Sequence, residues 1–250
     1  ILFSATLLPI KYYMDQLGGN EDDYAVYAPS SFNKENRLIM VGADVSTKYT
    51  RRNEKEYRKI LKYIIEFTKA KTGNYMVFFP SYQMMQTVAD MAKDELDGIV
   101  VQDSNMTEEE REAFLDNFVE NPKESRIGFC VMGGIFSEGI DLKYNRLIGA
   151  VIVGTGLPMV CNERELFRSY FDEKRGKGFD YAYLYQGMNK VLQSAGRVIR
   201  TNEDRGAILL LDERFLSPQY YQLFPREWYP FEIVNLKSMI STVKAFWDKC

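Results

Sequence analysis

Short apolar runs recur along this sequence, and a longer segment with the spacing of an amphipathic helix separates most of them. The runs are residues 38–41, 75–79, 98–101, 126–132, 147–153 and 207–211. Runs of this length that are apolar throughout are typical of strands buried on both faces, which occur mainly in parallel sheets covered by helices. The alternation therefore predicts an α/β fold with a mostly parallel sheet and helices on both of its faces.

An apolar run also opens the chain. Ile1, Leu2 and Phe3 read as a further strand, which ends at Ser4. Because a core strand with no preceding partner is unusual, we expect the chain to be a fragment excised from a longer protein. The sequence contains no internal repeat, low-complexity tract or linker, so we expect residues 1–250 to form a single domain.

Several helices carry clear start signals. Asn53 with Glu56, and Thr107 with Glu110, have the spacing of capping boxes, and apolar residues follow each pair at helical intervals. A further helix is predicted after Pro80, and another over residues 236–247. These segments supply the amphipathic helices that a buried parallel sheet needs on its faces.

Charge and residue content exclude several classes of protein. The 250 residues include 32 basic and 35 acidic side chains, so no overall positive field attracts nucleic acid, and any such contact must be local. The chain has no histidine, which excludes His-based triads and His–metal sites. Its three cysteines are too few for a four-Cys metal site, and we predict no metal ligands in this chain.

The residue composition also indicates the cellular compartment of the protein. An odd number of well-separated cysteines suggests free thiols in a reducing compartment. The longest uncharged stretch, residues 147–162, is too short and too interrupted by glycine and proline to cross a bilayer, and the first residues do not read as a signal peptide. We therefore expect a cytoplasmic protein that makes no membrane contact.

The segment from residue 190 to residue 200 is the most informative in the chain. At about 100° per residue, a helix would place Gln193, Arg197 and Arg200 on one face and the apolar residues on the other. Two guanidinium groups and an amide form an array of donors suited to phosphate oxygens. The alternative, a solvated basic stripe, stays open on this segment alone.

A glycine-rich segment directly follows the apolar run at 126–132. Gly133 and Gly134 would lie at the carboxyl end of that strand, the edge at which open α/β sheets place their ligands. Glu138 and Asp141 could then engage a ribose hydroxyl or a charged partner across the site. An ordinary strand-to-helix turn is the alternative interpretation.

Ser81 and Tyr82 follow another buried run. Helix N-termini bind phosphates through free N–H groups, and a tyrosine can stack against a base. The alternative is that Ser81 only caps the next helix. No phosphate-binding loop of the form GxxxxGK[ST] occurs in the chain.

In order and spacing, these segments resemble the second motor domain of a superfamily 2 DNA helicase of the XPD/DinG type. Residues 3–9 resemble motif III, residues 78–82 motif IV, residues 133–141 motif V and residues 193–200 motif VI, and residues 204–215 match the tail of motif VI. The resemblance implies a RecA-like, P-loop-NTPase-like fold that closes on a first motor domain of the same parent chain.

The resemblance also implies a shared ATP site. Arg197 and Arg200 would act as arginine fingers, with Gln193 positioning them or the attacking water. Gly139, Asp141 and Glu138 would line or adjoin the nucleotide. The P-loop, the Mg²⁺ site and any iron–sulfur cluster would belong to the first motor domain, so we expect the isolated chain to lack ATPase activity.

A single-stranded DNA track is implied as well. Ser81, Tyr82, Gly133 and Gly134 would hold phosphates of the strand across the top of the sheet, and Ser137 with Glu138 would connect the DNA to the nucleotide site.

Two rival functions remain at this stage. One is a non-catalytic module that binds single-stranded nucleic acid, which would be favoured if Arg197 and Arg200 were buried in ion pairs within the domain. The other is a nuclease or nucleotide hydrolase that works alone, for which the sequence offers no cluster of acids at metal-binding spacing.

Overall fold

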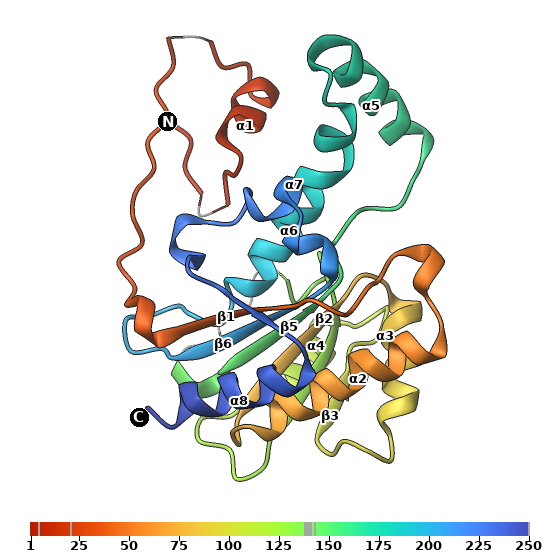
Figure 1. Ribbon diagram of the computed structural model, residues 1–250, viewed down its shortest axis with the longest axis vertical. Coiled ribbons are helices and arrows are strands. Elements are labelled where there is room, and N and C mark those ends of the chain that lie inside the picture. The colour runs from red at the N-terminus through yellow and green to blue at the C-terminus, as the bar shows by residue number, and fades with distance from the viewer. Residues whose placement is uncertain (5, 21, 138–141, 143, 250) are drawn as a thin grey trace.

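The computed structural model describes the chain except for residues 5, 21, 138–141, 143 and 250. Seven strands form one sheet (Figure 1): β1 (Arg37–Gly42), β2 (Asn74–Phe79), β3 (Ile99–Val101), β4 (Arg126–Val131), β5 (Gly149–Val153), β6 (Gly206–Leu211) and β7 (Glu232–Val234). Their order across the sheet is β3-β4-β2-β5-β6-β1-β7, and every pair is parallel. The predicted α/β fold with a parallel sheet is thus confirmed.

The six internal runs became strands, whereas the two ends of the chain differ from prediction. β7 was not anticipated, because it is a short edge strand with Glu232 and Ile233 exposed and so lacks a two-sided apolar run. The strand predicted at residues 1–3 is wrong: Ile1, Leu2 and Phe3 are exposed and join no sheet.

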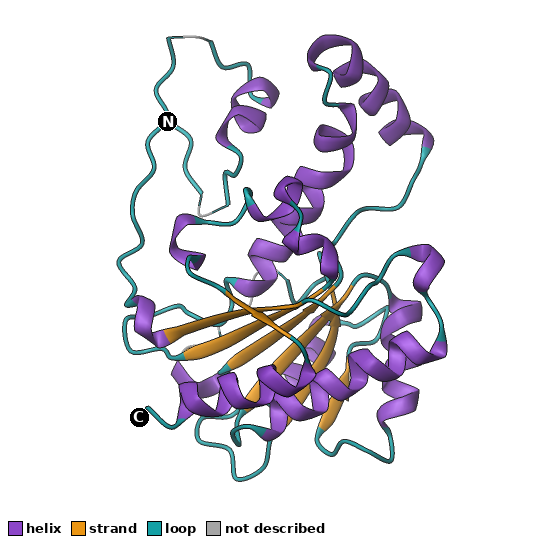
Figure 2. Cartoon of the chain, viewed as in Figure 1, coloured by secondary structure: helices purple, strands orange, loops and turns teal. Residues whose placement is uncertain are grey.

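Helices cover both faces of the sheet (Figure 2). On one face lie α2 (Glu54–Lys69), α3 (Tyr82–Ala92) and α8 (Leu236–Trp247). On the other lie α4 (Glu108–Leu115), α6 (Tyr185–Ala195) and the short α7 (Pro218–Tyr221). Short 3-10 turns occur at Lys34–Asn36, Tyr49–Arg51, Tyr144–Arg146, Glu213–Leu216 and Arg226–Trp228.

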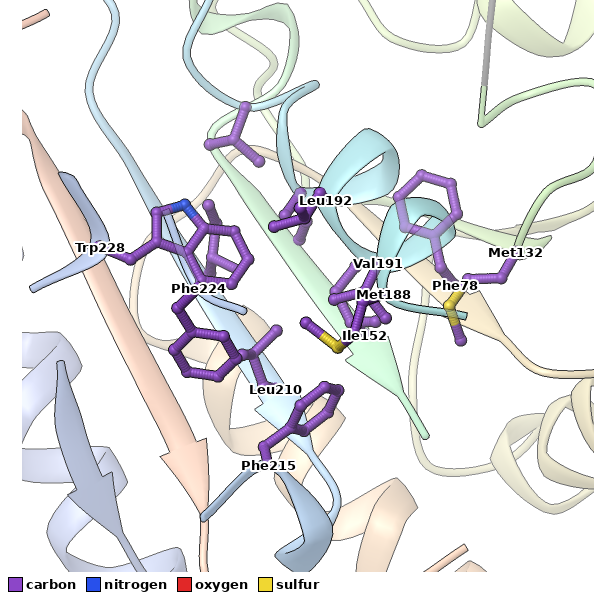
Figure 3. Close-up of a cluster of buried hydrophobic side chains, with 14 of the residues drawn as sticks. Phe78, Met132, Ile152, Met188, Val191, Leu192, Leu210, Phe215, Phe224 and Trp228 are labelled. Atoms are coloured by element: carbon purple, nitrogen blue, oxygen red, sulfur yellow. The ribbon is translucent and has the colours of Figure 1, made fainter. Parts of the chain in front are cut away.

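The alternation of side chains along the central strand β2 separates two cores. Tyr75, Val77 and Phe79 pack with α2, α3 and α8, whereas Met76 and Phe78 pack with α4 and α6. Successive residues of a strand point to opposite faces, so one fully apolar strand serves both cores. Figure 3 shows the second core, in which Met188 and Val191 of α6 lie over the sheet.

Two further helices extend beyond the carboxyl edge of the sheet, at the top of Figure 1. These are α1 (Ile10–Gln16) and α5 (Asn162–Arg175), and a π-helical turn at Asp180–Leu184 joins α5 to α6. Asp15 of α1 pairs with Arg175 at 2.8 Å, and the Tyr12 ring packs edge-on against Tyr181. The N-terminal helix is thereby attached to α5 and the π-helical turn.

The predicted caps form, one of them only in part. Thr107 and Glu110 make a complete capping box at α4. Asn53 accepts a hydrogen bond from the Glu56 N–H at 3.0 Å, but the Glu56 carboxylate accepts from the Ser46 N–H at 2.7 Å and does not return to Asn53. A tertiary contact thus replaces half of that local motif.

The helix predicted through Arg200 is wrong in its length. α6 ends at Ala195, and Gly196 is its C-cap. Val198 and Ile199 are both buried, whereas glycine is a poor helix former. The chain therefore leaves the helix to bury two apolar side chains, and Arg197 and Arg200 come after the helix instead of on its face.

Candidate functional site

A groove of about 640 Å³ lies beside the C-terminal end of α6. Gln193, Arg197 and Arg200 all line it, together with Ser4 and Thr6 from the N-terminal segment. The three residues predicted to meet a phosphate therefore do come together, although they do so at a helix end and the turn that follows it.

Arg197 points toward the glycine-rich loop. Its Nε and Nη2 donate to the Ser137 carbonyl oxygen at 3.0 and 2.7 Å, and the side chain is half-buried. Arg200 is exposed. The backbone N–H groups of Arg200 and Thr201 both donate to Oδ2 of Asp204 at 2.6 Å, which fixes the turn after α6. The second arginine is thus held at the rim of the groove by its backbone.

The glycine-rich loop uses its backbone donors internally. The Gly133 N–H donates to Oγ of Ser137 at 2.8 Å, and the Gly134 N–H donates to the Val131 carbonyl at 3.1 Å. The resemblance to the helicase family implied that these two residues hold phosphates of the DNA strand. In the structure the tight turn, with Gly133 at a φ of 70°, directs their N–H groups into the loop instead.

Ser137 is fully buried and joins the two candidate sites. Its Oγ accepts from Gly133 and donates to the Val131 carbonyl at 3.3 Å, and its own carbonyl oxygen accepts from Arg197. Oγ of Ser194 on α6 lies 3.4 Å from Oγ of Ser137. The hydroxyl of Ser137 is therefore fully used by hydrogen bonds within the protein and is not available to a ligand.

A second group of residues gathers at the carboxyl ends of β2, β3 and β4. The side chain of Ser81 accepts from the Met84 N–H at 3.3 Å and so caps α3. Tyr82 remains 38% exposed, and its hydroxyl accepts from Nε2 of Gln102 at 2.7 Å. Oε1 of Gln102 accepts from the Val131 N–H at 2.9 Å.

Gln102 was not predicted from the sequence as a site residue. It is only 3% exposed, and it ties Tyr82 to the end of β4. Its one sequence signal is that of a polar residue directly after a buried strand, which places it at the ligand-binding edge of a parallel sheet.

A buried polar network occupies the carboxyl ends of β1, β5 and β6. Asp212, fully buried, accepts from the Thr47 N–H and hydroxyl at 2.8 and 2.6 Å and from Nε and Nη2 of Arg214 at 2.8 and 2.9 Å. Burial opposes ionisation of Asp212, but the hydrogen bonds and charge of Arg214 outweigh it, so the pKa of Asp212 lies below its ordinary value.

The network leaves room for no side chain at Gly154. A β-carbon there would lie 2.7 Å from Oγ1 of Thr47, and Gly154 has a φ of 81°. Thr47 was not predicted to have a role, and Asp212 and Arg214 were identified only as part of the segment that resembles the tail of motif VI.

Three predicted residues, Glu138, Gly139 and Asp141, lie outside the described residues. In the part of the chain that is described, no three acidic or cysteine side chains gather as a metal site would require. The described helices include none with both the length and the apolar character needed to span a bilayer.

Comparison with known proteins finds relatives over most of the chain. A family model described as "Helicase C-terminal domain" matches residues 64–231. The ATP-dependent DNA helicase DinG of Photobacterium profundum is 28% identical over 247 residues, covering 94% of this chain and 34% of the relative. The 3'-5' exonuclease DinG of Staphylococcus aureus is 28% identical over 195 residues, covering 76% of this chain and 20% of the relative.

Solved structures show the same fold. The structure named XPD_APO superposes with a TM-score of 0.73 at 20% sequence identity, covering 93% of this chain and 47% of that one. At this identity the likeness concerns the fold alone, and it confirms the RecA-like α/β architecture. The chain spans about a third of the Photobacterium relative and a fifth of the Staphylococcus relative.

Proposed function

The chain belongs to the helicase C-terminal domain family, as the C-terminal domain of an XPD/DinG-type helicase, and from that premise we propose that it is one half of an ATP-dependent DNA helicase motor. In this proposal residues 1–250 act as a single cytoplasmic domain. A first RecA-like motor domain of the same parent chain supplies the P-loop, the Mg²⁺ site and any iron–sulfur cluster.

The convergence of Gln193, Arg197 and Arg200 on one groove is the observation that carries the proposal. Paired guanidinium donors suit phosphate oxygens. ATP bound by the first motor domain would supply the phosphoryl group, and the arginines would stabilise the negative charge that develops during its transfer. Such arginine fingers are worth roughly 10³–10⁵-fold in rate.

The helix end positions these groups. Gln193 lies in the last turn of α6, while the hydrogen bonds from Arg197 to Ser137 hold its guanidinium group toward the glycine-rich loop. We expect Gln193 to orient the arginines or the attacking water, and Glu138, Gly139 and Asp141 to adjoin the nucleotide from the same loop.

The DNA track would run along the carboxyl edge of the sheet. Tyr82 is held by Gln102 and offers a partly exposed ring, and stacking of a base on such a ring contributes about 1–3 kcal/mol. Ser81 opens the helix beside it. Because Ser137 contacts Gly133 on one side and Arg197 on the other, it would transmit a change at the DNA to the nucleotide site.

Substitution of the arginines tests the proposal. In the longer parent protein we expect Arg197→Ala or Arg200→Ala to abolish ATP hydrolysis while nucleotide binding stays within about tenfold, because the loss falls on the transition state. Arg58→Ala is the control, since Arg58 lies on α2, across the sheet from the groove, in a surface pair with Glu95. Normal turnover by both groove variants would overturn the proposal.

The isolated chain gives a second test. Without a P-loop in its sequence, it should show no Mg²⁺-dependent ATP turnover. Burial of both arginines in ion pairs within the domain would favour the binding-module alternative, whereas Arg200 is exposed and Arg197 is half-buried. The exposure of these two side chains supports the proposal of a helicase motor over that of a binding module.

A further inference from the structure

Lys190 lies over the glycine-rich loop, and none of the roles above uses it. A β-carbon placed on Gly133 would lie 3.0 Å from both Cδ and Cε of Lys190. The lysine stem therefore crosses the loop in the space that a side chain at position 133 would fill. Gly133 itself is exposed, so this crossing lies at the open carboxyl edge of β4.

The charge of Lys190 is poorly compensated. Burial, and then the nearby charge of Arg164, lower the pKa of Lys190. The structure gives Lys190 no ion pair with any carboxylate in the described part of the chain. Arg164 donates to the amide oxygen of Gln186, which is neutral. Two partly desolvated cations repel each other, and a bound anion would remove that cost.

The two glycines of the loop do not supply that anion's partner. The N–H groups of Gly133 and Gly134 already donate to Ser137 and Val131. A phosphate over these glycines would therefore be met by a side chain, and Lys190 is a cation whose stem lies against Gly133. An ammonium group on a long stem suits a phosphate as a single point charge.

We propose that Lys190 is a phosphate-binding residue of the DNA track and that its ammonium group contacts a phosphodiester of single-stranded DNA passing over Gly133 and Gly134. The inference rests on the proposed function, which brings DNA to this edge, and adds a residue and a kind of contact to it. Gly133 then has a second role, because its missing side chain lets the lysine stem lie over the loop.

Binding of a fluorescein-labelled oligothymidine to the 250-residue chain, followed by anisotropy over a range of salt concentrations, tests this role. Lys190→Met keeps the apolar stem and removes the charge. Each phosphate contact with a single strand contributes about 0.7 to the slope of log K against log salt, so the variant should bind about fivefold to tenfold more weakly at about 50 mM salt, with the slope reduced by about 0.7.

Two controls separate this contact from a change in net charge. Lys190→Arg should retain most of the affinity. Lys62→Met removes the same charge from an exposed site on α2, across the sheet, and should change affinity less than about twofold. If the unchanged chain binds but Lys190→Met has the same affinity and slope, Lys190 is not a contact and the proposed function stands. If the unchanged chain binds no oligothymidine, the DNA track and the Lys190 contact both fail.

Discussion

Asp212 offers a sharp test of how the carboxyl edge of the sheet is held together. Asp212→Asn keeps the shape of the side chain but removes its charge and turns one oxygen into a donor. Oδ2 of Asp212 accepts from Thr47 and from Nη2 of Arg214, and Oδ1 accepts from Nε of Arg214, so the new amide N–H groups face donors in either orientation. Arg214, only 20% exposed, loses its counter-ion.

The expected cost follows from this burial. Removing one partner of a buried ion pair destabilises a protein by about 3–5 kcal/mol. Total stabilities are only about 5–15 kcal/mol, so the variant should lose a large part of its free energy of unfolding. For a chain of this length each kcal/mol lowers Tm by about 2–4 °C, which predicts a fall of at least about 6 °C.

The neighbouring residue provides a matched control. Glu213 pairs with Lys48 at 2.9 Å, but the two side chains are 33% and 48% exposed. Exposed ion pairs contribute about 0–1 kcal/mol to the free energy of unfolding, so the urea midpoint of Glu213→Gln should lie close to that of the unchanged chain. The reasoning is refuted if Asp212→Asn loses no more stability in urea than Glu213→Gln.

The stabilisation that Asp212 provides should depend on pH, and the same assay can measure the direction of that dependence. Because the folded pKa of Asp212 is below its ordinary value, the charge stabilises the fold above an unfolded pKa of about 3.9 and ceases to do so as pH falls through the folded value. The difference between the unchanged chain and Asp212→Asn should therefore shrink below about pH 4. A difference that is constant between about pH 7 and about pH 3 would contradict this explanation.

Three further predictions concern single positions. Gly187→Ala should lower the free energy of unfolding by about 1–3 kcal/mol, because its β-carbon would lie 2.7 Å from the Thr155 carbonyl oxygen, and an unchanged urea midpoint would refute that close packing. Gln102→Ala should lower the free energy of unfolding by about 1–3 kcal/mol, because it leaves the buried N–H of Val131 without an acceptor. Tyr82→Phe removes only the hydroxyl that Gln102 contacts and should lower the free energy of unfolding by less. Equal losses would exclude a separate role for the glutamine. Thr107→Ala should cost about 1 kcal/mol through loss of the α4 cap, measured by thermal unfolding, and no loss would mean that the capping box contributes nothing.

Local sequence pattern determined the elements and much of their arrangement. The six apolar runs became strands because residues apolar on both faces of a strand can be buried only inside a covered sheet. Thr107, with Glu110 three residues later, formed the predicted capping box because both partners lie within one turn. The order of the motifs also placed the arginines and the glycine-rich loop in the same region of the fold.

Contacts between distant residues decided the site itself. Asp212 meets Thr47 across 165 positions, and Arg197 meets Ser137 across 60, so no local pattern reveals either pairing. The end of α6 at Ala195 follows from the burial of Val198 and Ile199, which depends on what lies beneath them. A sequence states which groups are available as donors and acceptors, but only the packed chain decides which of them are already bonded to one another and which are left for a ligand.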